Sequence, residues 1–202
     1  VILDDVHERQ LDADLALAMV CELAQLREDL TVVAMSATLD AAFWAGLLGA
    51  GGGPAPVVEI PAVLHPLEIR WEPASGSPTG VRGVRREFID HVVARTAAAF
   101  GTGADPLGGH APGALVFMPG AREVDAVAAG LRARPGLADV DVMPLYGRMD
   151  ARSQDDALRP SGRRRIVVAT SVAESSLTVP GVNLVVDSGL SREPRLDRGR
   201  QM

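Results

Sequence analysis

Two adjacent acidic residues, Asp4 and Asp5, follow the short apolar run Val1–Leu3, and His7 comes two positions later. Such a run predicts a buried strand, and the carboxyl ends of parallel strands are where open α/β folds bind ligands. A carboxylate placed there can hold Mg²⁺, while its neighbour accepts a proton from an attacking water. Adjacent ionised carboxylates also repel each other, which favours a cation nearby. An acidic turn that caps the next helix explains the pair as well, so both interpretations stay open.

Pairs of hydroxyl side chains follow two further apolar runs. In the stretch MSATLD, Ser36 and Thr38 come at the end of a predicted strand, where they can bond a neighbouring carboxylate or histidine. In the stretch IVVATSVAESS, Thr170 and Ser171 come between a predicted strand and a short helix, a place where hydroxyls and exposed N–H groups bind phosphate. Taken alone, the first pair also fits an ordinary helix cap, and the second an ordinary strand-to-helix connection.

Short β-branched runs alternate with helical patterns along the chain, which is typical of βαβ units around a parallel sheet. The predicted strands are Val1–Leu3, Thr31–Met35, Val57–Ile60, Ala114–Met118, Val140–Leu145, Ile166–Ala169 and Asn183–Val186. The predicted helices are a segment in which Leu15, Met19, Leu23, Leu26 and Leu30 form one apolar face, then Asp40–Leu48 and Arg82–Phe100. A crossover rich in proline, Pro61–Gly80, lies between the two series. We therefore expect an α/β protein with two parallel-sheet domains, residues 1–73 and 74–202.

Composition narrows the functions that these elements can serve. The 202 residues carry a net charge of −6, which argues against binding nucleic acid through bulk electrostatics. All 20 basic residues are arginine, so the chain has no lysine for a Walker A phosphate loop. Four of them, Arg159 and Arg163–Arg165, fit either a solvated loop or a phosphate contact. A single cysteine and no apolar run of about 18 residues predict a cytoplasmic protein that does not span a membrane.

Five stretches, taken in order, resemble superfamily 2 helicases of the DEAH-box group, and within them the bacterial HrpB-type ATP-dependent helicases. LDDVHER stands where the family has its D-E-x-H-E-R box, and MSATLD matches the S-A-T motif. LVFMPGAREV is similar to the start of the second RecA-like domain, and PLYGRMDARSQDDAL to the segment after it. ATSVAESSLTVPGVNLVVDSG resembles the motif A-T-N-x-A-E-T-S-L-T-I with its trailing V-D-x-G.

The resemblance assigns expected roles around ATP. Asp4 would coordinate the Mg²⁺ of MgATP, and Asp5 would stand in place of the general-base glutamate. His7 would belong with Asp5 to the catalytic residues, and it would also act with Ser36 and Thr38 to couple the nucleotide site to the strand-binding face.

In the second domain the resemblance implies contacts with nucleic acid. Thr170, Ser171 and Gly120 would contact the strand, and Thr178 would approach the nucleotide.

Several positions depart from the family pattern. Asp5 is one methylene shorter than glutamate, which shortens its reach by roughly 1.5 Å, and a misplacement of that order can cost about 10²-fold in rate. Ser171 stands where asparagine is usual, and Pro180 where an acidic residue is common. The phosphate loop and the final arginine-finger motif are expected upstream of Val1 and downstream of Met202.

The expected function is that of the central part of an ATP-dependent helicase that moves 3′ to 5′ along single-stranded nucleic acid, RNA being the expected strand. The 202 residues alone are expected to be inactive, because they lack the Walker A lysine. Two alternatives stay open: a related translocase that acts on DNA or ribonucleoprotein, and a degenerate helicase-like scaffold that binds strands or partners without turnover. Protein partners are not predicted.

Overall fold

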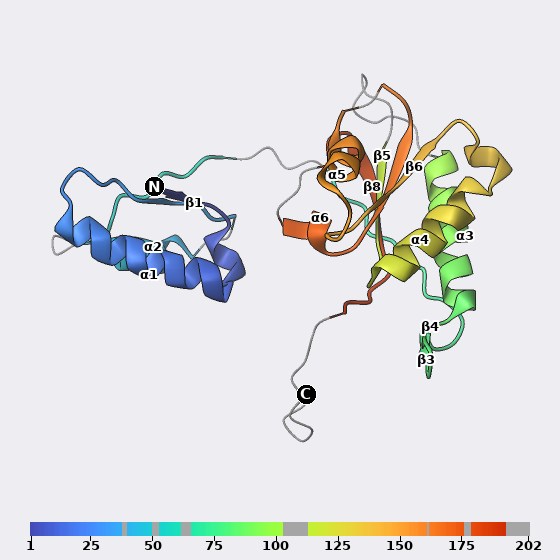
Figure 1. Cartoon of the computed structure of the whole chain (residues 1–202), viewed down its shortest axis with the longest axis horizontal. Coiled ribbons are helices and arrows are strands. Elements are labelled where there is room, and N and C mark those ends of the chain that lie inside the picture. The colour runs from blue at the N-terminus through green and yellow to red at the C-terminus, as the bar shows by residue number, and fades with distance from the viewer. Residues whose placement is uncertain are drawn as a thin grey trace. The chain divides into compact units, whose positions relative to one another are not determined.

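The computed structural model divides the chain into two compact units, Val1–Glu68 and Ile69–Met202, each with its own core (Figure 1). It describes residues 1–37, 40–49, 53–61, 66–102, 113–160, 162–175 and 179–192. Within these ranges the chain forms helices and parallel strands, so the predicted α/β class is confirmed. No helix in the described ranges is long and apolar enough to cross a membrane.

The first unit is a two-stranded parallel sheet covered by two helices. Strand β1 (Ile2–Leu3) pairs with β2 (Val33–Ala34), and helices α1 (Leu11–Leu26) and α2 (Ala41–Leu48) pack beside them. A short 3₁₀ turn, η1 (Val6–Glu8), follows β1. Its small core consists of Val6, Leu17 and Trp44, with Leu3, Cys21, Ala34 and Leu48 packed against them.

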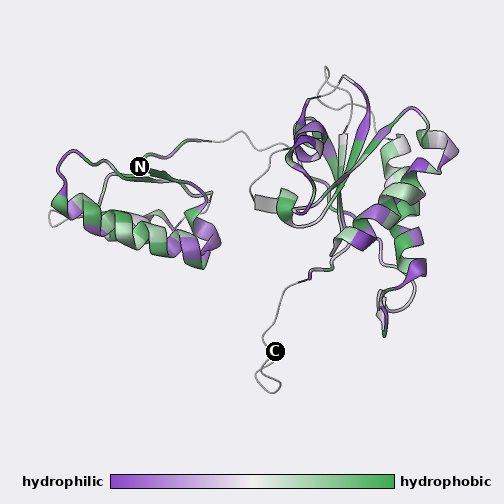
Figure 2. Cartoon of the chain, in the orientation of Figure 1, coloured by the Kyte–Doolittle hydropathy of each residue, from purple (hydrophilic) through white to green (hydrophobic). Residues whose placement is uncertain are grey.

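The direction of the apolar face of α1 differs from the prediction. The buried side carries Leu17, whereas Leu15, Met19 and Leu26 of the predicted stripe are 57%, 63% and 82% exposed. The helix is apolar on more than one side, as its colouring shows (Figure 2). Three- and four-residue spacing identifies a helix, but it cannot choose between two apolar faces when the sheet covers only one.

The predicted strand Val57–Ile60 is also wrong. This segment forms no helix or strand in the described structure, and Val58 and Ile60 are 83% and 86% exposed. A β-branched run forms a strand only where a neighbouring strand offers free N–H and C=O groups. The described sheet of this unit ends at β1 and β2.

The second unit is built on a four-stranded parallel sheet with the order β6-β7-β5-β8. The strands are β5 (Gly113–Phe117), β6 (Asp141–Leu145), β7 (Arg165–Ala169) and β8 (Val182–Asp187). Helices α3 (Arg86–Thr102) and α4 (Ala121–Arg132) cover one face, and α5 (Ala151–Leu158) and α6 (Val172–Ser175) lie on the other (Figure 1). A 3₁₀ turn, η2 (Pro135–Leu137), follows α4, and a small antiparallel hairpin, β3 (Thr79–Gly80) with β4 (Gly83–Val84), precedes α3.

Strand β7 shows why its sequence is apolar without interruption. Ile166 and Val168 pack into the core under α3 and α4, whereas Val167 and Ala169 pack into the core under α5 and α6. Successive side chains of a strand point to opposite faces, so a strand with helices on both sides is apolar throughout. The predicted strand is therefore confirmed, with Arg165 as an additional first residue.

The arginine cluster before β7 stabilises the fold. Arg163 pairs with Asp141 at 3.3 Å, and the Arg164 guanidinium lies 4.8 Å from the centre of the Phe100 ring. Arg165 is 4% exposed and donates hydrogen bonds to the carbonyl oxygens of Ala157, Arg159 and Pro180. These residues lie at the amino-terminal end of β7, away from the strand ends that carry the candidate site, so the structure favours the interpretation as a loop over a phosphate contact.

Arg165 is expected to be important for the stability of the second unit. Burial lowers the pKa of its guanidinium, which nonetheless stays charged near neutral pH. Arg165→Met leaves three carbonyl groups without their donor and should lower the free energy of unfolding by about 3 kcal/mol. Arg163→Met, which removes a largely exposed ion pair, is the control and should cost less than about 1 kcal/mol. Equal urea-unfolding midpoints for the two variants would contradict the assignment.

The N-cap residue of helix α5, Asp150, is expected to stabilise the fold to a degree that depends on pH. Asp150 accepts hydrogen bonds from the Ser153 N–H at 3.0 Å and the Ser153 hydroxyl at 2.7 Å, and these bonds lower the pKa of the carboxyl group. Because the folded-state pKa is lowered, the stabilisation is complete above the unfolded-state value of about 3.9 and is lost as the pH falls through the folded-state value. Asp150→Ala should therefore shift the urea midpoint more at pH ~7 than at pH ~2. Asp150→Asn, an uncharged cap, should show little of this pH dependence.

Candidate functional site

The acidic pair of the first unit lies in a tight loop at the carboxyl end of β1. Asp5 has a left-handed backbone, with φ 53° and ψ 34°, and its N–H donates to Asp4 Oδ1 at 2.9 Å. Aspartate reaches this conformation more readily than most residues because its short polar side chain can bond locally. Asp4 is exposed and Asp5 is half-buried, so solvent has access to the pair.

The loop is held to the neighbouring strand by its backbone. The Val6 N–H donates to the Met35 carbonyl at 3.2 Å, and the Glu8 N–H donates to the Asp5 carbonyl at 3.0 Å. Val6 is 5% exposed and belongs to the core of the unit. A strained backbone persists only where its surroundings fix it on both sides, and here the buried Val6 supplies one of those anchors.

Arg9 supplies the second anchor, and the sequence analysis gave it no role. It is also left-handed, at φ 53°, and its Nη2 lies 3.1 Å from Asp14 Oδ2. The same guanidinium lies 5.6 Å from the centre of the Phe43 ring and 5.7 Å from that of Trp44. Arg9 thus joins the start of α1 to α2 across the exit of the acidic loop. The available signal was an arginine five residues before an aspartate, with an aromatic pair in the following helix.

His7 connects the acidic loop to the segment that follows β2. Its Nδ1 lies 3.5 Å from the Ala37 N–H, which donates to it. Ser36, the neighbour of Ala37, is exposed at the same strand end. The structure therefore brings Asp4, Asp5, His7 and Ser36 together at the carboxyl end of the β1–β2 pair. Thr38 lies outside the described residues.

The ligands that this edge offers are hard oxygens. Asp4 Oδ1 accepts one backbone N–H, and neither Asp4 Oδ2 nor the half-buried Asp5 carboxylate has a hydrogen bond among the described residues. Among the described residues no three His, Cys, Asp or Glu side chains cluster as a metal site would require. One or two carboxylates are nonetheless enough for Mg²⁺, which keeps several waters and takes its remaining ligands from phosphate. The residues present fit that ion.

Cys21 is not part of this edge. It packs against the core formed by Val6, Leu17 and Trp44, and burial raises the pKa of its thiol. A raised pKa disfavours the thiolate, so Cys21 serves as a small apolar side chain beside the core rather than as a reactive thiol.

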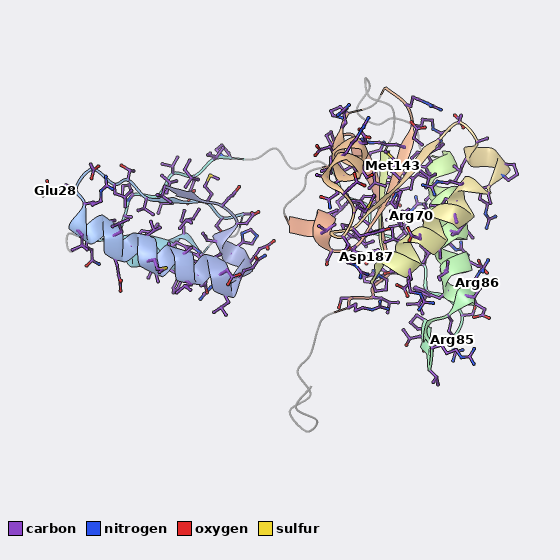
Figure 3. All side chains as sticks on the ribbon, in the orientation of Figure 1. Glu28, Arg70, Arg85, Arg86, Met143 and Asp187 are labelled. Carbon is purple, nitrogen blue, oxygen red and sulfur yellow. The ribbon has the colours of Figure 1, made fainter. Side chains whose placement is uncertain are left out.

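In the second unit the strand ends are level. Phe117 of β5 is in register with Ala169 of β7 on one side and with Asp187 of β8 on the other. The ladder continues one step further, because the Met118 N–H donates to the Ala169 carbonyl at 2.8 Å and the Ser188 N–H donates to the Phe117 carbonyl at 3.2 Å. The residues that follow these strands therefore share one edge, and Figure 3 labels Asp187 at this end of the sheet.

Three of the predicted site residues of the second unit lie at this edge. Thr170, which is half-buried, and Ser171, which is exposed, follow β7, and Gly120 precedes α4 after β5. The Thr170 N–H donates to the Leu145 carbonyl at 3.1 Å, so its backbone continues the sheet while its side chain lies at the strand end. Thr178 lies outside the described residues.

Two charged residues at the same edge escaped the sequence analysis. Glu123, on the first turn of α4, is 7% exposed, and Arg192 Nη2 donates to its Oε1 at 3.4 Å. A side chain at Gly120 would collide with both, since its Cβ would lie 2.8 Å from Arg192 Nη1 and 2.8 Å from Glu123 Oε2. The two residues are 69 positions apart in the sequence, so no local pattern links them.

Comparison with known proteins shows which helicases the chain resembles. Residues 108–201 match the helicase conserved C-terminal domain. The chain is 38% identical over 98% of its length to the ATP-dependent RNA helicase HrpB of Escherichia coli, and it spans 22% of that protein. It is 33% identical over 96% of its length to the ATP-dependent RNA helicase HrpA of Escherichia coli, and spans 14% of it.

A solved structure agrees with these relatives. The crystal structure of the Escherichia coli DEAH/RHA helicase HrpB matches the whole chain with a TM-score of 0.73 and 36% identity, and the chain covers 24% of it. The resemblance of the chain to DEAH-box helicases of the HrpB type is thereby confirmed. Over nearly all of its length the chain is thus similar to HrpB-type DEAH/RHA helicases, of which it spans less than a quarter.

Proposed function

We propose that the whole protein is an ATP-dependent RNA helicase, in which residues 1–73 are the second half of the first RecA-like domain and residues 74–202 belong to the second. One observation in the structure carries the proposal most strongly. Asp4, Asp5, His7 and Ser36 come from two segments of the chain and meet at the carboxyl end of one parallel strand pair. The names of the relatives, which are ATP-dependent RNA helicases, support the same function.

At the nucleotide, each residue of this edge has a proposed task. Asp4 would hold Mg²⁺ together with water and phosphate oxygens, and the ion would neutralise charge on the phosphates of ATP. Asp5 would accept a proton from the attacking water, and the hydrogen bond from its N–H to Asp4 Oδ1 keeps the two residues together in the loop. His7 and Ser36, with Thr38, would transmit the state of this edge to the strand-binding face, since His7 already accepts the Ala37 N–H.

On the second unit, Gly120, Thr170 and Ser171 would contact the RNA strand. Their common position at one sheet edge supports this, because hydroxyl and backbone N–H groups at strand ends make sequence-independent contacts with phosphate. Thr178 would approach the nucleotide. Translocation from 3′ to 5′ and a cytoplasmic location, which the single cysteine favours, are parts of the same proposal.

The role of Asp5 can be tested in the whole protein. Asp5→Asn removes the proton acceptor and should lower RNA-stimulated ATPase activity by on the order of 10²-fold or more, whereas Asp5→Glu restores the usual reach and should raise it. Asp12→Asn, which neutralises an exposed carboxylate on α1, is the control and should leave the rate unchanged. If neither change at position 5 alters the rate, Asp5 is not the base. If the unaltered protein shows no turnover while binding RNA, the alternative of a degenerate scaffold is correct.

The choice between RNA and DNA needs a separate measurement. We expect ATP-dependent strand displacement on an RNA duplex with a 3′ single-stranded overhang, and weak or no displacement on a DNA duplex of the same sequence and overhang. An RNA duplex with a 5′ overhang is the control for polarity. Preference for the DNA duplex would show that the protein is a DNA translocase.

A further inference from the structure

Glu123 is unusually buried for a charged residue on the first turn of a helix. The residue is 7% exposed, and its carboxylate accepts one hydrogen bond in the described structure, from Arg192 Nη2 at 3.4 Å. Its second oxygen, Oε2, is buried and has no partner among the described residues. Because a buried carboxylate is strongly destabilising without a cation, Glu123 favours every arrangement in which a guanidinium stays beside it.

Arg192 has the opposite exposure. Its side chain is 58% exposed, whereas that of Glu123 is 9% exposed. A guanidinium carries five N–H donors in one plane, and Glu123 engages one edge of that plane. The other donors have no hydrogen-bond partner among the described residues, and the side chain is largely open to solvent. Glu123 therefore holds one nitrogen of the guanidinium and leaves its other N–H groups available to a ligand.

Gly120 makes this arrangement possible. Its missing Cβ leaves the space in which Arg192 Nη1 and Glu123 Oε2 lie, each 2.8 Å from where that Cβ would be. The guanidinium thus lies directly over the backbone that connects β5 to α4. The same glycine is the position that the sequence motif assigns to the RNA strand, so the cation and the predicted contact coincide.

We propose that Arg192 binds a backbone phosphate of the RNA strand and that Glu123 is its positioning residue. This inference rests on the proposed RNA helicase function. A phosphate fits because a planar guanidinium offers paired N–H donors to two of its oxygens, and because the pair holds the donors in place before the strand arrives. A phosphate of the nucleotide has the same chemistry, and the experiment separates the two sources.

The test uses the whole protein and a fluorescent single-stranded oligouridine, with affinity measured by anisotropy over a series of salt concentrations in the absence of nucleotide. Arg192→Ala should weaken binding by about 10-fold and reduce the slope of log K against log salt by about 0.7. Arg192→Lys keeps the positive charge but not the planar pair of N–H donors, so its affinity for the oligouridine should lie between those of the unaltered protein and Arg192→Ala. Arg134→Ala removes an exposed arginine beyond the far end of α4 and should bind like the unaltered protein.

The positioning role has its own readout. Glu123→Gln should weaken binding by about 3-fold, and adding it to Arg192→Ala should cause no further loss, because a positioning residue acts only through its partner. Additive losses would overturn this role. Unchanged affinity and salt slope in Arg192→Ala would overturn the phosphate contact, as would a raised KM for ATP with RNA binding intact, which would place Arg192 at the nucleotide. Failure of the unaltered protein to bind RNA would instead overturn the proposed function.

Discussion

The register of the parallel ladder is the constraint on which the second unit depends. Phe117 of β5 lies opposite Ala169 of β7 on one side and Asp187 of β8 on the other, and from Ala114 onward the register on both sides is constant. Every residue that immediately follows them is thereby delivered to one edge, whatever its distance along the chain. The helices on both faces hold that ladder by burying alternate side chains of β5 and β7. A one-residue slip would exchange the two faces and move the hydroxyl pair of Thr170 and Ser171 out of line with Gly120.

In the first unit the loop that carries the acidic pair is held mainly by local interactions. The unit's two short strands cannot by themselves define the loop at Asp4 and Asp5, so local interactions do so. Val6 is anchored in the core, and Arg9 is held between Asp14 and the aromatic pair of α2. Among the described residues other than glycine, two have a left-handed backbone conformation, Asp5 and Arg9, and both are in this loop. Backbone strain here is matched by anchors on either side, which is the arrangement expected where a carboxylate must be held in one place.

Features that depend on residues close together in the sequence could be predicted, whereas those that depend on residues far apart could not. Strand β7 and the turn at Thr170 are encoded locally, by an apolar run followed by hydroxyls, and the structure confirms them. The apolar face of α1 and the strand expected at Val57–Ile60 depend on which neighbours cover or pair with them, so local patterns gave the wrong answer. The pair of Glu123 and Arg192 depends on contact across 69 positions, which periodicity cannot detect. The motif order was informative for a further reason: a parallel sheet converts order along the chain into neighbours at an edge.

An acidic chain can contact a polyanion only where individual cations are placed for it. With a net charge of −6, these 202 residues have no general electrostatic attraction for RNA, and several of their arginines already stabilise the fold. Arg164 stacks on Phe100, Arg165 holds three carbonyl groups, and Arg9 holds the acidic loop. Arginine suits both tasks because its planar fork can bond one partner and present its remaining donors to another. Binding of this kind depends on geometry more than on total charge, and the proposed contact between Arg192 and a phosphate would be an example of it.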